Sequence, residues 1–219
     1  MKFEKTKVFN FDGAIRGMRN PYNSWDKSDS KWVLNEKDAT EYFVIGEKDK
    51  DLAVSLIKGG SEHRKFLRQI FVCVDISAPL YWWKEFVTYR VGVISNSCST
   101  MHTITKYKFN LDMFEHDSTR KNQVSILSNV IKELNKLREE YLQTKDKNTW
   151  KDIIVTLPDS FIQKRTITMT YENLLAMCSK GQRRFHKLTE WSTDFINWAR
   201  SLPYAQEFIF TDELDKNKE

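Results

Sequence analysis

The residues best suited to chemistry form a short polar run in the middle of the chain. Six small polar residues stand in a row at 95–100, Ser-Asn-Ser-Cys-Ser-Thr, and Arg90 precedes them. Hydroxyls and an amide held between packed elements suit a polar ligand, and a guanidinium offers a fixed fork of donors to phosphate or carboxylate. The alternative is a capped turn, in which Ser or Asn closes the start of a helix. The residues alone leave both interpretations open.

A second polar stretch covers residues 14–25, where Arg16 and Arg19 stand among apolar residues. If this stretch is helical, the two arginines lie one turn apart and both could face an anion. The alternative is a polar surface loop.

Familiar catalytic and metal-binding motifs are absent from the sequence. There is no P-loop, GxGxxG, HExxH or GxSxG pattern, and the four histidines show no ligand spacing, so no metal site is predicted. Cys98 and His102 are neighbours in sequence, whereas the members of a Cys–His nucleophile pair usually come from distant parts of a chain. Any catalysis is therefore expected to depend on a bound organic cofactor.

Hydrophobic periodicity predicts the elements that position the polar run. A helix is expected from Ala78, with Pro79 in its first turn and its end near Gly92. Residues 70–76 predict a central strand covered on both faces, because both of its faces are apolar. Further strands are predicted at residues 2–9 (an edge strand) and 163–170. Helices are predicted at residues 48–58, 120–143 (the longest, capped by 117–119), 149–157, 171–180 (ended by Gly181) and 183–199, and residues 36–45 fit a short helix or a strand.

The order of these elements favours an α+β fold. The length of 219 residues suits one domain over residues 1–219, with a frayed charged tail at about 212–219. Hydrophobic residues make up 40% and charged residues 30%, as in a folded soluble protein.

The net charge and the number of cysteines limit the expected classes of binding partner and the expected cellular compartment. The net charge of +5 is scattered, which is compatible with a small anionic ligand and falls short of a nucleic-acid signature. Three distant cysteines indicate neither a disulfide framework nor a zinc site. Neither a signal peptide nor an apolar run long enough for a membrane span is seen, so the cytoplasm is the expected location and no membrane partner is predicted.

Several short motifs resemble those of the flavin-dependent thymidylate synthases, over about residues 48–205. Leu56-Ile-Lys-Gly-Gly-Ser-Glu62 is similar to the end of a family helix, residues 70–76 match its strand, and Ala78-Pro79 matches the start of its motif helix. Thr88-Tyr-Arg90 occupies the place of an Arg-His-Arg triplet. The segment from Asn96 to His102 occupies the place of the Asn-Glu-x-Ser-x-Arg-Tyr signature.

Later segments continue the resemblance. Leu157-Pro158, the following strand and Asn173 are similar to the family's Leu-Pro, strand and Asn-Leu-Arg. Arg184 and Trp191 fall where an arginine and an Ala-Gln-Trp-Glu helix are expected. The fold that the resemblance implies has a central antiparallel or mixed sheet flanked by helices, one of them long.

Site roles follow from the resemblance position by position. It implies that the cofactor is bound by Arg68, Thr88, Tyr89, Arg90, Asn96 and Asn173. It implies that the nucleotide is bound by Glu85, Ser97, Ser99, Met101, His102 and Arg184, with Arg184 and Ser99 as the catalytic residues.

The signature also departs from the family pattern. Thr88 and Tyr89 replace an Arg and a His, and Ser97 replaces a Glu. Met101 stands where the family has a phosphate-binding Arg, whose charge His102 or the Arg16/Arg19 pair could supply. Arg68 stands where the family has a His, and Glu85 stands in for a Gln.

The resemblance implies a homotetramer that binds FAD between subunits and methylates dUMP to dTMP, using methylenetetrahydrofolate and NADPH. The altered signature keeps two alternatives open. One is flavin-dependent modification of another pyrimidine nucleotide, and the other is a non-catalytic nucleotide-binding or scaffold protein on the same fold.

Overall fold

The computed structural model describes residues 1–117 and 119–218, without the side chains of residues 215–218. The strands are β1 (Lys2–Phe9), β2 (Lys31–Asn35), β3 (Thr40–Val44), β4 (Phe71–Pro79), β5 (Ile94–Ser97) and β6 (Ile162–Thr170). The α-helices are α1 (Phe11–Arg19), α2 (Glu47–Lys58), α3 (Leu80–Phe86), α4 (Thr100–Thr103), α5 (Lys121–Thr144), α6 (Lys147–Thr156), α7 (Tyr171–Met177), α8 (Lys180–Phe185), α9 (Ile196–Arg200) and α10 (Ala205–Phe208). Tighter or wider helical turns are η1 (Asn20–Tyr22), η2 (Trp25–Lys27), η3 (Lys65–Gln69), η4 (Leu111–Met113), the π-helical η5 (Glu190–Phe195) and η6 (Thr211–Lys218).

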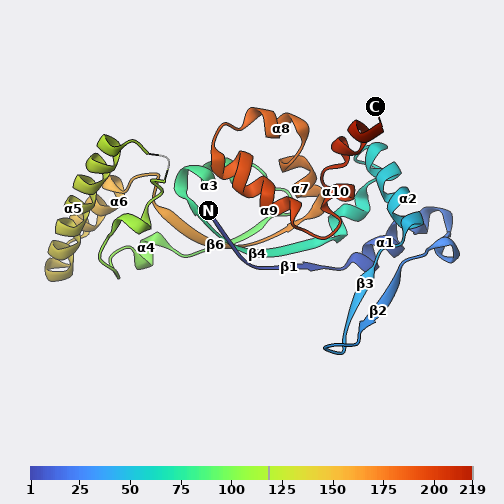
Figure 1. Ribbon diagram of the computed structural model, residues 1–219. Helices are drawn as coiled ribbons and strands as arrows, with labels where there is room; N and C mark the ends of the chain where they lie inside the picture. The colour runs from blue at the N-terminus through green and yellow to red at the C-terminus, as the bar shows by residue number, and fades with distance from the viewer. Residues whose placement is uncertain (118, 219) are drawn as a thin grey trace. The chain divides into compact units, whose positions relative to one another are not determined.

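An antiparallel sheet of order β1-β4-β6-β5 forms the centre of the fold and is flanked by helices, so the α+β prediction is confirmed (Figure 1). The predicted edge strand is β1. Strand β4 is internal and buries Val72, Val74 and Ile76 on one face. Its other face is only half covered, with Phe71 41% exposed, so the prediction of a strand covered on both faces is wrong.

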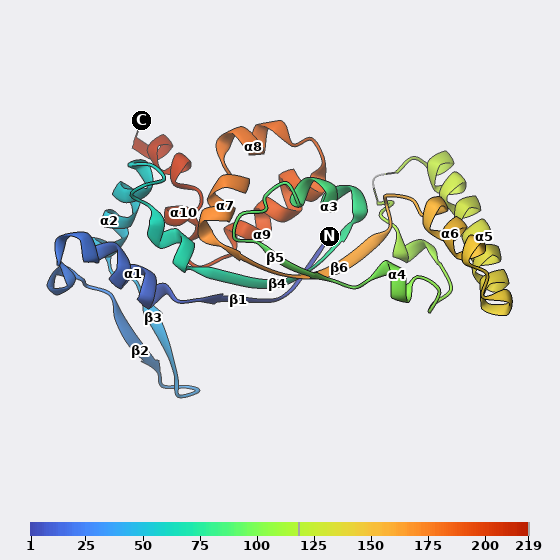
Figure 2. The same ribbon diagram turned by 180° about the vertical axis from the view of Figure 1, so that it is seen from behind.

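Strands β2 and β3 form a separate antiparallel hairpin, in which Lys31 pairs with Val44 and Trp32 with Phe43. The Trp32 and Phe43 rings meet edge to face, with their centroids 5.4 Å apart. The hairpin projects away from α1 and α2 in both ribbon views (Figures 1 and 2). Of the two structures that residues 36–45 fitted, the strand is the one formed.

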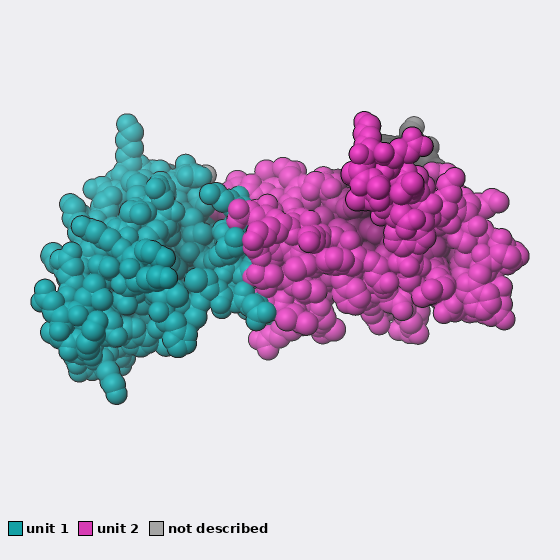
Figure 3. Space-filling model, turned by 90° about the horizontal axis from the view of Figure 1, so that it is seen from below, with its two compact units in different colours: residues 1–2, 76–88, 96–165 teal, residues 3–75, 89–95, 166–219 magenta. Residues whose placement is uncertain are grey.

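The chain divides into two compact units, shown in two colours in Figure 3. Unit 1 comprises Met1–Lys2, Ile76–Thr88 and Asn96–Arg165, and unit 2 comprises Phe3–Asp75, Tyr89–Ser95 and Thr166–Glu219. Each unit is assembled from several segments of the chain, and such a unit need not fold on its own. The prediction of one domain over residues 1–219 stays a prediction.

The core of unit 1 packs against the long helix α5. This helix confirms the prediction of a long helix over residues 120–143. The helix packs beside α6 (Figure 2) and buries Ile131 and Leu134, while Asp146 caps α6 by accepting from the Thr149 amide at 3.1 Å. The core cluster contains Ile104, Phe109, Phe114, Ile131, Leu134, Ile153 and Phe161. The predicted cap of α5 includes Ser118, which lies outside the described residues. Arg120 stands at the cap position and its side chain makes no capping bond.

Helix α3 begins two residues later than the sequence predicts. Pro79 ends β4 with ψ 155°, an extended conformation, so it precedes the helix and does not occupy its first turn. The helix buries Trp82, Trp83 and Phe86 and ends at Phe86. Gly92 has φ +75°, so the chain does use the conformational freedom of glycine at this point.

The C-terminal helices are shorter than predicted. The predicted helix 171–180 is two helices, α7 and α8, because the Ser179 side chain caps α8 and places Gly181 inside it. The predicted helix 183–199 breaks at His186, whose ψ of 123° is extended, and resumes as η5 and α9.

The start of the predicted tail is held by ion pairs. Asp212 pairs with Arg183 at 2.9 Å and Glu213 with Arg200 at 2.8 Å. The backbone of 211–218 forms η6, while the side chains of 215–218 and residue 219 lie outside the description.

Candidate functional site

A cavity of about 750 Å³ lies within unit 2, and we call it the unit 2 cavity. Its lining combines apolar side chains with a few polar groups, as ligand sites do. The lining residues are Arg68, Phe71, Val91, Gly92, Val93, Ile94, Thr170, Glu172, Asn173 and Ala176. Two residues predicted to bind the cofactor, Arg68 and Asn173, therefore meet at one cavity.

Asn173 fixes one wall of this cavity. Its Oδ1 accepts from the Thr170 amide at 2.9 Å and from Thr170 Oγ1 at 2.8 Å, which forms the capping box of α7. Its Nδ2 donates to the carbonyl of Val91 at 2.6 Å, which ties segment 91–94 to α7. The carboxamide is thus largely committed to the protein, and Asn173 shapes the cavity more than it offers groups to a ligand.

Replacement of Asn173 tests this tie. Asn173→Ala removes both the cap and the bond to Val91 and is expected to lower the free energy of unfolding by about 2 kcal/mol. Asn173→Asp keeps the acceptor of the cap and loses only the donor, so it is expected to cost about half as much. Urea unfolding measures both values. A cost near zero for Asn173→Asp would contradict the separate role of the Val91 bond.

Charge in the cavity comes from one exposed and one paired group. Glu172 is half-buried, and its two carboxylate oxygens share the Arg64 Nε–H in a bifurcated hydrogen bond, each at 3.1 Å. This ion pair offsets the Glu172 carboxylate. The exposed Arg68 guanidinium is then the cation that the lining offers to an anionic ligand.

The altered triplet is used for packing. The Thr88 hydroxyl donates to the Glu85 carbonyl at 2.8 Å, and the Tyr89 ring lies 5.6 Å from the Trp191 ring. Arg90 is exposed and directly precedes Val91 of the cavity wall. Contacts within the protein therefore engage Thr88 and Tyr89, while the exposed Arg90 side chain stands next to the cavity wall.

The polar run lies in β5, α4 and the turn between them. Cys98 donates its amide to the Lys164 carbonyl at 2.9 Å, and its own carbonyl accepts from Gln163 Nε2 at 2.9 Å. Ser99 is the residue before α4, and its side chain makes no capping bond. Within the described part of the chain, neither the Ser97 nor the Ser99 hydroxyl has a hydrogen-bond partner. The interpretation as a side-chain cap is therefore wrong for Ser99.

Among the other predicted site residues, Glu85 is half-buried in α3, and four more are exposed. Asn96 is exposed in β5, and Met101 and His102 are exposed in α4, with Met101 54% exposed. Arg184 is exposed in α8 and is not part of the lining of the unit 2 cavity.

The two early arginines have different surroundings. Both line a small cavity of about 210 Å³ in unit 2, together with Trp25. Arg19, however, is buried and donates to Asp49 Oδ1 at 2.6 Å. Its charge is already neutralised, so the expectation that Arg16 and Arg19 both face an anion is wrong for Arg19.

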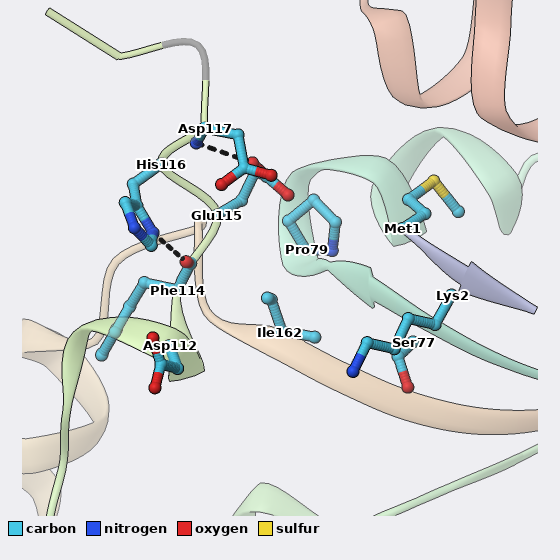
Figure 4. A pocket seen from close by; sticks show the side chains of 10 residues that line it. All are labelled: Met1, Lys2, Ser77, Pro79, Asp112, Phe114, Glu115, His116, Asp117 and Ile162. Carbon is cyan, nitrogen blue, oxygen red and sulfur yellow. Dashed lines mark hydrogen bonds between the residues drawn. The ribbon is translucent and has the colours of Figure 1, made fainter.

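A cavity of about 400 Å³ in unit 1 contains none of the predicted site residues (Figure 4). His116 Nδ1 lies 2.8 Å from the Phe114 carbonyl, and the Asp117 amide donates to Glu115 Oε1 at 3.1 Å. Across the described residues, no group of three or more His, Cys, Asp or Glu side chains is placed to hold a metal ion.

Sequence reasoning missed several residues of the unit 2 cavity. Thr170 precedes Asn173 by three residues, which is the spacing of a capping box and was a usable signal. Val91, Val93 and Ile94 gave no such signal, because an apolar pattern does not show that Val91 and Ile94 are exposed beside the positive-φ Gly92.

The described residues form no helix long and apolar enough to cross a lipid bilayer.

The fold as a whole is that of the flavin-dependent thymidylate synthases. Flavin-dependent thymidylate synthase ThyX from Helicobacter pylori, complexed with FAD and dUMP, matches with a TM-score of 0.70 and 16% identity, over 97% of this chain and 99% of that chain. A second structure of the same protein with FAD and dUMP, at 2.31 Å resolution, matches with the same score and identity, over 97% of this chain and 98% of its own. No protein-family model and no curated protein matches the sequence.

Proposed function

We propose that this chain is a flavin-dependent thymidylate synthase, which converts dUMP to dTMP with methylenetetrahydrofolate and NADPH. The observation that carries the proposal is the likeness over nearly the full length of both chains to a protein complexed with FAD and dUMP. Fold alone does not determine reaction, so the proposal also needs a site of suitable chemistry.

The unit 2 cavity fits part of a flavin. Its apolar walls, which include Phe71, Val93 and Ile94, suit a flat aromatic ring, and the Arg68 guanidinium suits a phosphate group. Because Glu172 is paired with Arg64, its negative charge is offset and does not repel an anionic ligand. These features support a flavin as the ligand of this cavity.

The residues then divide by what their side chains can offer. When bound, the flavin supplies the redox and one-carbon chemistry. Arg68, Arg90 and Asn96 carry exposed donors for the cofactor, while Thr88, Tyr89 and Asn173 act as positioning residues. We assign the nucleotide to Glu85, Ser97, Ser99, Met101, His102 and Arg184. Arg184 polarises the pyrimidine through its permanent positive charge, and Ser99 donates its hydroxyl to the nucleotide.

Assembly into a homotetramer and location in the cytoplasm belong to the same proposal. Exposed apolar side chains at the cavity wall, Val91 at 88% and Ile94 at 66%, support coverage by another subunit. Light scattering of the purified protein is expected to give the mass of four chains, and the mass of one chain would contradict this part of the proposal.

The reaction is tested by incubating the protein with FAD, dUMP, methylenetetrahydrofolate and NADPH and quantifying dTMP by chromatography. Arg184→Ala is expected to lower turnover by roughly 100-fold or more, because it removes a charge that acts on the reacting base. Lys187→Ala, which removes an exposed charge three residues away, is the matched control and is expected to retain activity.

Two results would redirect the proposal. Flavin binding without dTMP formation would favour another pyrimidine nucleotide as substrate, which a panel of nucleoside monophosphates would identify. Normal turnover by Arg184→Ala would remove Arg184 from the catalytic residues and leave the reaction itself standing.

A further inference from the structure

Arg165 on β6 is held in a fixed position inside unit 1. Its guanidinium lies over the Trp83 ring, 4.4 Å from the ring centroid, and its Nε donates to Gln163 Oε1 at 3.0 Å. Gln163 is itself buried, and its backbone carbonyl accepts from Trp83 Nε1 at 3.0 Å. An aromatic face and an amide therefore fix the plane of the guanidinium, a degree of order that exposed arginines lack.

The charge of Arg165 has no carboxylate partner among the described side chains. Its described interactions are the Trp83 ring and Gln163, neither of which is an anion, and its terminal Nη groups donate to no described residue. The side chain is half-buried, and burial lowers the pKa of this guanidinium. Withdrawing a cation from water without pairing it with an anion is unfavourable. Unpaired half-buried charges of this kind concentrate at functional sites.

One side chain links Arg165 to the polar run. Gln163 accepts from Arg165 Nε through Oε1 and donates to the Cys98 carbonyl through Nε2 at 2.9 Å. Cys98 lies between Ser97 and Ser99, whose hydroxyls are uncommitted within the described chain. A single buried amide thus links the fixed cation to the segment that carries these two hydroxyls.

We propose that Arg165 binds a phosphate group of the ligand, with the Ser97 and Ser99 hydroxyls as further donors. This inference rests on the proposed function and deepens it. At Met101, where the resemblance places a phosphate-binding arginine, the chain has an uncharged side chain. Arg165, on β6, supplies a guanidinium that Gln163 links to Cys98, three residues before Met101. The phosphate belongs either to the nucleotide or to the flavin cofactor, and the two sources are separable by experiment.

The test compares ligands that carry phosphate with counterparts that lack it. Dissociation constants are measured by calorimetry on the full chain for dUMP against deoxyuridine, and for FAD against riboflavin. Arg165→Met keeps an aliphatic stem on Trp83 and is expected to weaken the phosphorylated member of one pair by roughly 10- to 100-fold, with its partner unchanged. Arg165→Lys is expected to give a smaller loss. Lys164→Ala, which removes a charge on the exposed face of the same strand, is the matched control and is expected to leave both pairs unchanged.

Each outcome decides the inference. Selective loss of dUMP supports a nucleotide phosphate, and selective loss of FAD supports a flavin phosphate. Equal affinities of wild type and Arg165→Met for every ligand, with wild type binding dUMP, would overturn the role of Arg165 and leave the proposed function standing. A lower melting temperature with an unchanged dUMP to deoxyuridine ratio would assign Arg165 a structural role only. Wild-type protein that binds neither dUMP nor FAD would overturn the proposed function and this inference with it.

Discussion

Asp49→Asn is expected to lower the free energy of unfolding by about 3–5 kcal/mol, because it breaks a buried ion pair and leaves the other charge inside the protein. The Asp49 side chain is 0% exposed and its partner Arg19 is 6% exposed. Besides Arg19, the carboxylate accepts from Ser30 Oγ at 2.6 Å and from Ser28 Oγ at 2.5 Å. These bonds tie the segment after α1 to α2, so the loss extends beyond one pair of side chains.

Urea unfolding followed by circular dichroism measures this effect. Asp51→Asn is the matched control, since Asp51 lies on the same helix, is exposed and has no described partner. Its cost is expected to stay within about 0.5 kcal/mol. A difference of less than about 1 kcal/mol between the two variants would contradict a buried network at Asp49.

The same network gives a pH dependence. Burial alone would raise the pKa of Asp49, but hydrogen bonds from Ser28, Ser30 and Arg19 outweigh it, and the pKa lies below the usual 3.8. A group whose pKa is lowered by folding contributes stability that is present above its unfolded pKa and is lost as the pH falls through the folded value. Wild-type stability is therefore expected to fall below about pH 4, and the fall should be smaller in Asp49→Asn.

Leu134→Ala is expected to cost about 2–5 kcal/mol, since it opens a cavity in the core of unit 1. Leu134 is 0% exposed and packs in the cluster that contains Ile131 and Ile153. Leu142→Ala on the same helix removes the same atoms from a side chain that is 40% exposed, so it is expected to cost less than about 1 kcal/mol. Thermal unfolding of both variants checks the difference. Similar melting temperatures would contradict the placement of α5 against this core.

Elements with strong periodicity were predictable from the sequence. The β-branched run of β4 and the apolar stripe of α5 each predicted the type and place of the element, although the pattern of β4 did not show that its second face is only half covered. The hairpin of β2 and β3 was not predictable, because residues 36–45 fit a helix as well as a strand. The break at His186 was not predictable, because the amphipathic pattern of 183–199 runs through it. Tertiary packing decides such segments.

The sequence could predict those site residues that stand in short recognisable motifs, but not the contacts that folding makes between distant residues. Asn173 and Arg68, which the resemblance assigned to the cofactor, both line one cavity, whereas the bond that commits Asn173 to Val91 depends on the tertiary fold. Arg165 was missed because a single arginine in a β-strand reads as an ordinary solvated charge. Its partners Trp83 and Gln163 are brought to it by folding alone.

The most direct test of the central claim is an absorption spectrum of the purified protein between about 300 and 550 nm, with and without added FAD, after gel filtration. The account predicts flavin bands that remain with the protein peak. A colourless protein under both conditions would contradict the flavoenzyme and favour a nucleotide-binding or scaffold protein on the same fold.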